Sequence, residues 1–282
     1  RAGVMSRGLG DVYKRQVEPI APWFKVWQYW ETRGKKPAYI DGLHKITREN
    51  AGVDVTLVTP STLRHYLPDI DSRILNVQEL AHKADLIRAR LVARYGGIWL
   101  DSDVVVLRDL SWAIEALGSY EFLGFTDKGQ LQPPDPKVRV NCFAAPPNSQ
   151  VMNAWVAAQS AKLEEGRTKF AWTEIGTDLL DPICLARRSL VNIQPFELIS
   201  PVSSRHVRRF GSRWRSPGKL IDQVHLVMLS NQALQKKYPD LIKMDVEAII
   251  DEGIYLSHFL KRAKDPQYTP PKSAVNMLRS VC

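Results

Sequence analysis

Two aspartates one residue apart, Asp101 and Asp103, follow the apolar segment 98–100 and precede a second apolar run at 104–107. Residues two apart in an extended chain point to the same side, so both carboxylates would face one region. Two like charges beside an apolar core are costly unless a cation lies between them. A hard divalent ion, Mn²⁺ or Mg²⁺, would relieve this repulsion and leave coordination positions for a diphosphate.

An Asp-x-Asp pattern is weak evidence by itself, because about one arises by chance in a chain of this length. The chain contains a second copy at 69–71, in a polar turn after Pro68, and this copy indicates no function. The position of Asp101 and Asp103 at the end of an apolar strand distinguishes them from that copy.

Asp85 and Arg88 are three residues apart, so they lie on one face of a predicted helix, beside its apolar stripe. One interpretation is an ion pair on a solvated helix surface. The other places the pair over the same cleft as Asp101, because the helix continues through two glycines directly into the aspartate strand. The residues alone leave both interpretations open.

The clearest element is a helix over 78–97, with apolar residues at helical spacing from Leu80 to Leu91 and Gly96-Gly97 as its end signal. Further strands are expected at 23–30, 53–60, 98–101, 121–125 and 138–146, and an extended path continues through 104–107. Further helices are expected at 38–46, 61–68 (opened by a serine cap), 150–166 and 173–188. This alternation predicts an α/β fold. The pattern gives no clear elements beyond residue 190.

The composition, 44% hydrophobic and 24% charged residues in a chain of 282, is typical of a globular protein. No apolar stretch reaches the ~20 residues that span a bilayer, and the start shows no secretory pattern. Three cysteines, Cys142, Cys184 and Cys282, are odd in number and not spaced as metal ligands, which indicates a reduced, cytoplasmic compartment.

Two segments, residues 1–16 and 204–219, differ in composition from the rest of the chain. Residues 1–16 lack periodicity, and 8–16 resemble translated adapter sequence, so we expect a non-native leader at 1–16 and a single domain at 17–282. The net charge is +9, and segment 204–219 carries six Lys or Arg and no acid. This basic segment is a solvated loop, or it contacts phosphates or an anionic membrane; no recognised nucleic-acid-binding module accompanies it.

The segment 84–104 resembles the core signature of glycosyltransferases with a DXD sugar-binding region. This grouping includes capsular polysaccharide synthesis proteins, family 32 mannosyl- and galactosyltransferases, and glucosylating toxins. The pattern is Asp-x-x-Arg, a helical spacer, Tyr-Gly-Gly-hydrophobic-aromatic, and Asp-x-Asp, and every element is present. Weaker similarity to the capsular members extends over 26–31, 141–156, 174–180 and 223–231.

The resemblance implies a GT-A type α/β fold, in which a Rossmann-like nucleotide-binding sheet merges with an acceptor-binding half. It also implies a metal-dependent hexosyltransferase that uses a nucleotide sugar, a UDP-sugar by preference, and retains the anomeric configuration. The implied acceptor is a saccharide or lipid-linked molecule in cell-surface polysaccharide synthesis. A lipid-linked acceptor would explain segment 204–219 as a peripheral contact with the inner membrane face.

Site roles carried over by position begin with the signature itself. Asp85 and Arg88 would hold hydroxyls of the donor sugar. Asp101 would contact the ribose and the sugar, or the metal through water, and Asp103 would bind the metal directly. Departure of the nucleoside diphosphate develops negative charge, which the metal would stabilise as a Lewis acid with help from Arg88.

The remaining roles lie outside the signature. Trp99 would lie near the donor, and Trp27 and Gln28 near the base. His225 would be a C-terminal ligand of the metal or a phosphate, although a buried structural histidine is an equal interpretation and His258 competes for the role. No general base is identified, and the role of Asp178 stays unassigned.

The principal alternative is a haloacid-dehalogenase-type phosphohydrolase, in which Asp101 would be the phosphoryl nucleophile. That family opens its fold with the aspartate motif, whereas a long folded segment precedes the motif here. A convincing downstream set of Ser or Thr, Lys and paired acids is also missing from the sequence. A non-catalytic binding module would depend on the basic segment alone.

Overall fold

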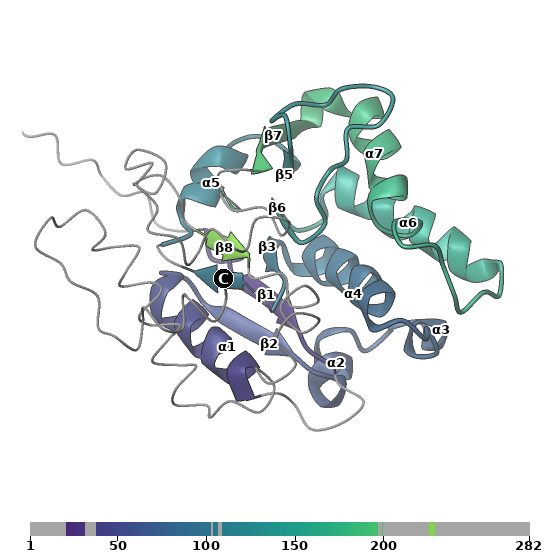
Figure 1. Cartoon of the computed structure of the whole chain (residues 1–282), viewed down its shortest axis with the longest axis horizontal. Coiled ribbons are helices and arrows are strands. Elements are labelled where there is room, and N and C mark those ends of the chain that lie inside the picture. Colours follow the sequence, from purple (N-terminus) through teal and green to yellow (C-terminus); the bar gives the residue numbers. More distant parts are fainter. Residues whose placement is uncertain are drawn as a thin grey trace, which may run out of the picture.

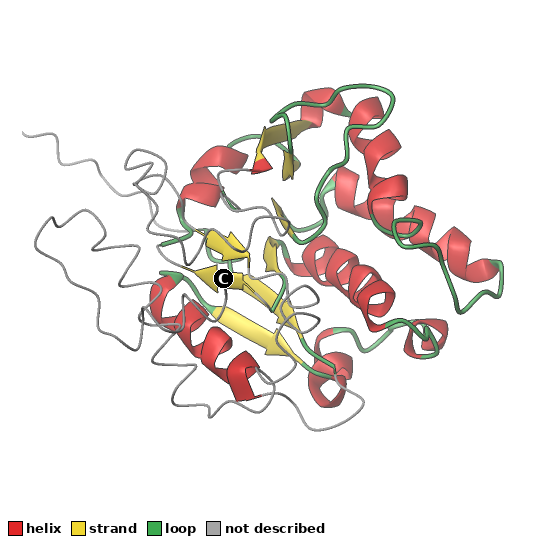
Figure 2. Ribbon diagram, in the orientation of Figure 1, coloured by secondary structure: helices red, strands yellow, loops and turns green. Residues whose placement is uncertain are grey.

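The computed structural model describes residues 21–31, 38–102, 104–106, 109–196, 199 and 226–228. A six-stranded sheet forms the centre of this part, and helices pack on both of its faces (Figure 1, Figure 2). The predicted α/β class is confirmed.

The sheet has the strand order β2-β1-β3-β6-β5-β7. The strands are β1 (Val26–Tyr29), β2 (Val55–Val58), β3 (Gly97–Leu100), β5 (Phe122–Thr126), β6 (Cys142–Ala145) and β7 (Val191–Pro195). β1 is parallel to β2 and β3, and β5 is parallel to β7. β6 is antiparallel to both of its neighbours and joins the two parallel groups.

The helices are α1 (Ala38–Asn50), α2 (Pro60–Tyr66), α3 (Ser72–Leu75), α4 (Leu80–Tyr95), α5 (Trp112–Leu117), α6 (Gln150–Glu164), α7 (Thr177–Ala186) and the 3₁₀ turn η1 (Arg188–Leu190). No helix in the described ranges combines the length and apolar character that a membrane span requires.

Alternation along the strands divides the buried side chains between two apolar clusters, one on each face of the sheet. Trp27, Trp99 and Phe143 belong to the cluster that α4 and α6 cover. Their sequence neighbours Val26 and Ile98 belong to the opposite cluster, which α5 covers. Both faces of the central strands are therefore buried, as expected for a sheet layered between helices.

In the order β2-β1-β3, the chain passes from β1 to β2 on one side and then crosses to β3 on the other side of β1. Open α/β sheets bind ligands beyond the carboxyl ends of the strands at such a reversal. Residues Glu31 and Asp101 follow these ends of β1 and β3, and the Ser102 hydroxyl donates to the Tyr29 carbonyl at 2.9 Å. The expected aspartate strand therefore ends at the ligand-binding edge of the sheet.

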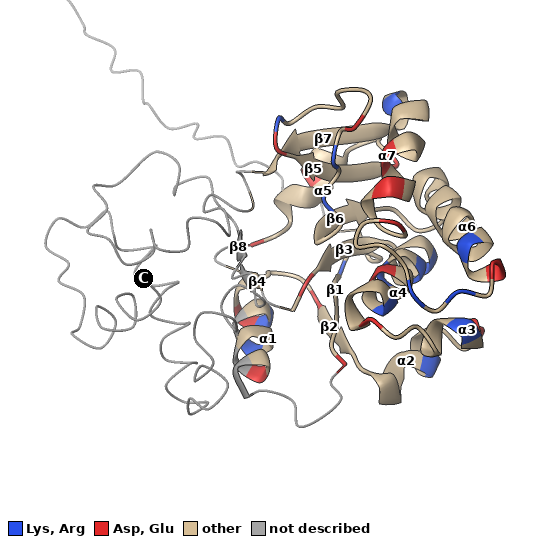
Figure 3. Ribbon diagram, turned by 45° about the vertical axis from the view of Figure 1, so that its right-hand side comes forward, with Lys and Arg blue, Asp and Glu red and all other residues tan. Residues whose placement is uncertain are grey.

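The expected extended path after the aspartates is confirmed as strand β4 (Val104–Val106). It pairs antiparallel with β8 (Leu226–Met228), so a segment far along the chain returns to this edge (Figure 3). Val104 pairs with Met228, and Val106 pairs with Leu226.

The end of α4 is also as predicted. Gly96 has a φ of +68°, a left-handed backbone conformation that residues other than glycine rarely adopt. A Cβ added at Gly97 would meet the Lys25 carbonyl oxygen at 2.4 Å, so β1 passes too close for any side chain there. The glycine pair therefore ends the helix and lets β3 lie directly beside β1.

Some element boundaries differ from the expectation. The predicted serine cap is wrong: α2 begins at Pro60, with Thr59 as its N-cap. The Thr59 backbone N–H donates to the Thr62 hydroxyl at 3.0 Å, and proline suits the first helical position because its missing N–H is unpaired there in any case. α1 extends to Asn50, and α7 begins after Gly176.

Candidate active site

The guanidinium of Arg88 lies between the carboxylates of Asp85 and Asp101. Its Nη1 atom is 3.1 Å from Asp85 Oδ1, and its Nη2 atom is 3.1 Å from Asp101 Oδ1. Only 6% of the Arg88 side chain and 9% of the Asp85 side chain are exposed. The pair is therefore buried and contacts Asp101, so the interpretation of a solvated surface pair is wrong. We call Asp85, Arg88 and Asp101 the charged triad.

Two neighbouring groups fix the position of Arg88. Its Nη1 atom donates to the Val140 carbonyl at 2.6 Å, just before β6. The centre of the guanidinium lies 5.0 Å from the centroid of the Trp99 ring, within the range of a cation–π interaction. The Trp99 indole N–H in turn donates to Asp101 Oδ1 at 2.8 Å. The predicted residues Asp85, Arg88, Trp99 and Asp101 thus form one connected group.

Asp85 is the buried end of this group. Burial raises its pKa from 3.8 to about 6, the adjacent Arg88 opposes this effect, and the negative charge of Asp101 adds to it. A Cβ added at Gly176 would lie 3.2 Å from Asp85 Oδ2, so the segment before α7 approaches this carboxylate closely. Perturbed carboxyl groups at the ligand edge of a sheet are typical of functional sites.

Asp101 is the accessible end of the charged triad, with 29% of its side chain exposed. Its Oδ1 atom receives both Arg88 and Trp99, whereas within the described part of the chain its Oδ2 atom has no hydrogen-bond partner. A hard cation or a hydroxyl donor suits such an oxygen. Asp101 is therefore the most exposed member of the triad.

A second charged pair, which the sequence analysis missed, lies at the end of β1. Lys83 Nζ is 2.9 Å from Glu31 Oε1, and the Tyr29 hydroxyl donates to Glu31 Oε2 at 2.5 Å. Burial, with Glu31 as a further cause, raises the pKa of Tyr29. Lys83 stands two residues before Asp85 on α4, whose ribbon carries both signs of charge in Figure 3.

Trp27 and Gln28 lie apart from the charged triad, on opposite faces of β1. The Trp27 side chain is buried in the core, where its indole N–H donates to the Gly96 carbonyl at 2.9 Å. Gln28 Oε1 is 2.9 Å from His44 Nδ1, and Gln28 Nε2 is buried with no partner among the described residues. The structure does not bring Trp27 and Gln28 together with the triad.

Three predicted ligands, Asp103, His225 and His258, lie outside the described residues. Within those residues, no three His, Cys, Asp or Glu side chains are grouped to hold a metal ion. Cys142 and Cys184 are both buried and form no disulfide. Among the predicted metal ligands, Asp101 lies in the described part.

Residues 12–161 match the family of capsular polysaccharide synthesis proteins. No curated protein gave a significant match.

Among solved structures, the chain is similar to the PaToxG glycosyltransferase, with 12% identity and a TM-score of 0.41 over 91% of this chain and 85% of that one. It is similar to the glycosyltransferase GlyE of Streptococcus pneumoniae TIGR4, with 14% identity and a TM-score of 0.46 over 88% of this chain and 65% of that one. It is also similar to the galactosyltransferase LgtC, solved with donor and acceptor sugar analogues, with 11% identity and a TM-score of 0.44 over 88% and 98%.

The family match covers more than half of the chain, including the whole of α4, both parallel neighbours of β1 and the charged triad. Together with the α/β sheet, it agrees with the capsular members that the sequence resemblance names. The chain belongs to the capsular polysaccharide synthesis protein family.

Proposed function

We propose that the protein transfers a hexose from a nucleotide-sugar donor, a UDP-sugar by preference, to a saccharide or lipid-linked acceptor of a cell-surface polysaccharide. We further propose a divalent-metal requirement and retention of the anomeric configuration. The single observation that carries the proposal is the charged triad at the carboxyl edge of β1 and β3, where α/β sheets bind nucleotides.

The charged triad suits the hydroxyl groups of a sugar. Each hydroxyl can donate to a carboxylate oxygen, and Asp101 Oδ2 is open to such a donor within the described chain. Arg88 holds both carboxylates in fixed positions, because its planar fork contacts one acid with each Nη atom. The triad therefore presents preformed acceptors for the donor sugar and its ribose.

Asp103 and Asp101 are the proposed ligands of Mn²⁺ or Mg²⁺, with His225 as a third ligand and His258 as its competitor. A bound divalent ion supplies stabilisation of the negative charge on the departing nucleoside diphosphate. The proposed role of Arg88 is to keep Asp101 oriented toward the ligand, because Arg88 Nη2 lies 3.1 Å from Asp101 Oδ1.

Gln28 is the proposed contact for the base. Its buried Nε2 atom lacks a partner among the described residues, and an amide N–H can donate to a carbonyl oxygen of a pyrimidine. Trp27 acts indirectly in this proposal, because its ring packs 5.3 Å from the rings of Tyr66 and Tyr95 and holds β1 in place.

The phosphohydrolase alternative is not favoured. The family assignment points to polysaccharide synthesis instead of phosphoryl transfer. The cytoplasmic location and the membrane contact through segment 204–219 remain predictions, because that segment lies outside the described residues.

The test is hydrolysis of UDP-sugars, GDP-sugars and other activated donors, with and without Mn²⁺, by the full chain and by the Asp103→Asn variant. We expect metal-dependent release of one nucleoside diphosphate, reduced by about 100-fold or more in the variant. Asp69→Asn is the matched control, because Asp69 belongs to the other Asp-x-Asp copy, where it pairs with Arg94 at the surface. Full activity of Asp103→Asn would refute the metal assignment.

A further inference from the structure

The segment between α6 and α7 presents an aromatic side chain to solvent. Trp172 is 64% exposed, in contrast to Trp27, Trp99 and Trp155, which are at most 1% exposed. Single exposed aromatic rings are common on protein surfaces, so Trp172 gains meaning from the groups that lie beneath it. Tyr120 is the other exposed large hydrophobic residue in the described part.

His82 lies beneath this exposed ring. Its ring centroid is 6.3 Å from that of Trp172 and 6.0 Å from that of Phe170. His82 is 2% exposed, and neither of its ring nitrogens has a hydrogen-bond partner among the described residues. A buried imidazole without partners is costly, and native proteins tolerate such groups mainly where a ligand or water completes them.

The pair of Trp172 and His82 adjoins the charged triad. His82 stands three residues before Asp85 on α4, which places it about one helical turn, roughly 5 Å, farther along the same face. Gly176, four residues after Trp172, contacts Asp85 Oδ2 closely. One short segment thus runs from the exposed indole to the buried carboxylate of the triad.

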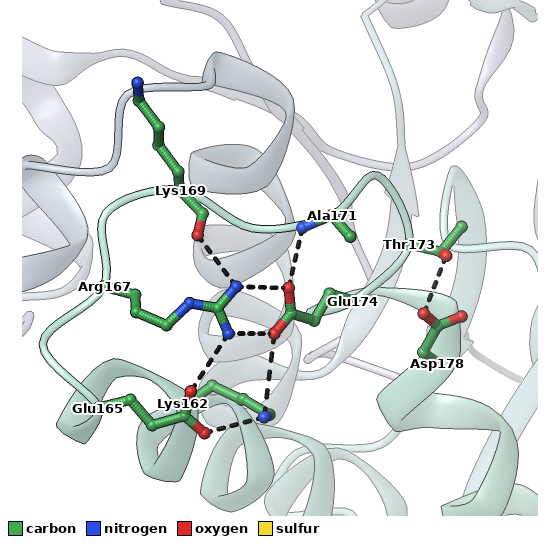
Figure 4. A network of polar contacts seen from close by, with 8 residues as sticks. All are labelled: Lys162, Glu165, Arg167, Lys169, Ala171, Thr173, Glu174 and Asp178. Atoms are coloured by element: carbon green, nitrogen blue, oxygen red, sulfur yellow. Dashed lines mark hydrogen bonds and ion pairs between the residues drawn. The ribbon is translucent and has the colours of Figure 1, made fainter.

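A polar network holds this segment in shape (Figure 4). Arg167 donates to both carboxylate oxygens of Glu174, at 2.5 and 2.9 Å, and the Ala171 backbone N–H donates to Glu174 Oε2 at 2.8 Å. The hydrogen bonds from Arg167 are the main cause that lowers the pKa of Glu174 to about 2. Thr173 donates to Asp178 at 2.9 Å. Trp172 is therefore flanked on both sides by residues held in place. This lowers the entropic cost of ordering the segment when a ligand binds.

We infer that Trp172 and His82 form the binding platform for the saccharide acceptor, beside the charged triad. This inference rests on the proposed function. The apolar C–H face of a sugar ring packs on the indole, and rotation of the exposed Trp172 side chain lets a sugar hydroxyl bond a ring nitrogen of His82. The combination of an apolar face and unpaired polar nitrogens suits a saccharide, whereas a lipid chain would leave the nitrogens unpaired.

The test is ligand-observed NMR with lactose, cellobiose and maltose as probes, on the full chain. We expect at least one of these sugars to bind, and Trp172→Ala to weaken that binding by about tenfold. His82→Phe keeps an aromatic ring against Phe170 but removes both nitrogens, and we expect it to weaken binding by about fivefold. Tyr120→Ala, which removes the other exposed aromatic ring, is the matched control and should leave sugar binding intact.

Melting curves of all variants establish that each one is folded. Binding that is equal in wild type and folded Trp172→Ala, or no binding of any of the three sugars to wild type, would overturn the platform. Donor hydrolysis by the wild-type protein tests the proposed function separately. Hydrolysis without sugar binding at Trp172 rejects the platform alone, and the absence of both activities rejects the proposed function as well.

Discussion

Arg88 is a single cation shared by two acids, so its geometry is as important as its charge. The Nη atoms of a guanidinium reach two carboxylates at once, whereas a lysine ammonium is a single point charge. We expect Arg88→Lys to lower kcat/KM for donor hydrolysis by about tenfold or more, because Asp101 loses its fixed orientation.

Steady-state hydrolysis of the preferred nucleotide sugar measures this effect. Arg94→Lys is the control, because Arg94 lies on the same helix and pairs with Asp69 at the surface. Surface pairs of this kind contribute little, so the control should behave as wild type. An Arg88→Lys variant with wild-type kcat/KM would mean that charge alone is sufficient at this position.

Asp85 gives the protein a pH-dependent stability term with a definite sign. Because its folded-state pKa is raised from 3.8 to about 6, the folded state binds this proton more tightly than the unfolded chain does. The contribution of Asp85 to the free energy of unfolding is therefore greatest below the unfolded pKa, and it is lost as pH rises through about 6.

We expect Asp85→Asn to remove this dependence. As the pH rises from about 4 to about 7, the unfolding free energy of the variant minus that of wild type should increase by on the order of 3 kcal/mol. Urea unfolding of both proteins across this window provides the measurement. A difference in unfolding free energy that is constant with pH would show that Asp85 titrates normally.

The charged triad was only partly predictable at the residue scale, and its surroundings were not. The three-residue spacing of Asp85 and Arg88 placed both on one helix face, but it left a surface ion pair and a shared site with Asp101 equally open. Lys83 and Glu31 were missed because 52 residues separate them and no motif links them. The core position of Trp27 follows from strand alternation, which places it on the α4 face with Tyr29.

At the element scale, one side chain on α6 connects three parts of the site. Gln159 is fully buried, and its Nε2 atom donates to the Asp85 carbonyl at 3.1 Å and to the Ile175 carbonyl at 3.0 Å. Its Oε1 atom accepts from Arg90 at 3.0 Å. The amide therefore joins α6 to α4 and to the segment before α7.

We expect Gln159→Leu to lower the free energy of unfolding by about 2 to 4 kcal/mol, because two buried carbonyls and a guanidinium each lose one hydrogen-bond partner. Denaturant unfolding followed by circular dichroism measures the change. Gln150→Leu, at the exposed start of the same helix, is the control and should change stability by less than about 0.5 kcal/mol. Equal effects of the two substitutions would show that the Gln159 network contributes little.

The elements themselves were largely readable from the sequence, because their hydrophobic periods are strong. The start of α2 was missed because Pro60 looks like a strand terminator and also serves as the first helical residue. The reversed direction of β6 has no local signal, since direction depends on which neighbours the strand meets. β8, with three residues, is too short for a periodic pattern.

For the whole molecule, we expect activity and folding to respond differently to metal removal. The two apolar clusters on the faces of the sheet are built from aliphatic and aromatic side chains of the helices and strands. The proposed metal contacts only the edge of this structure, so chelation should abolish donor hydrolysis and shift Tm by less than about 2 °C.

Calorimetry with and without EDTA, followed by restoration of activity with Mn²⁺, is the measurement. NaCl at the same ionic strength, in place of EDTA, serves as the control for nonspecific salt effects. Unchanged hydrolysis in EDTA would contradict the proposed metal requirement, and a large fall in Tm would assign the ion a structural role instead.

The pairing of β4 with β8 has a consequence for the order in which the protein is made. The two strands are separated by about 120 residues of chain, and ribosomes add roughly 5 to 20 residues per second. The strand that follows the aspartates therefore waits on the order of 10 s for its partner to emerge during synthesis. Until then its free edge can pair with another chain, so a nascent chain paused in this interval depends on holdase chaperones more than the completed protein does.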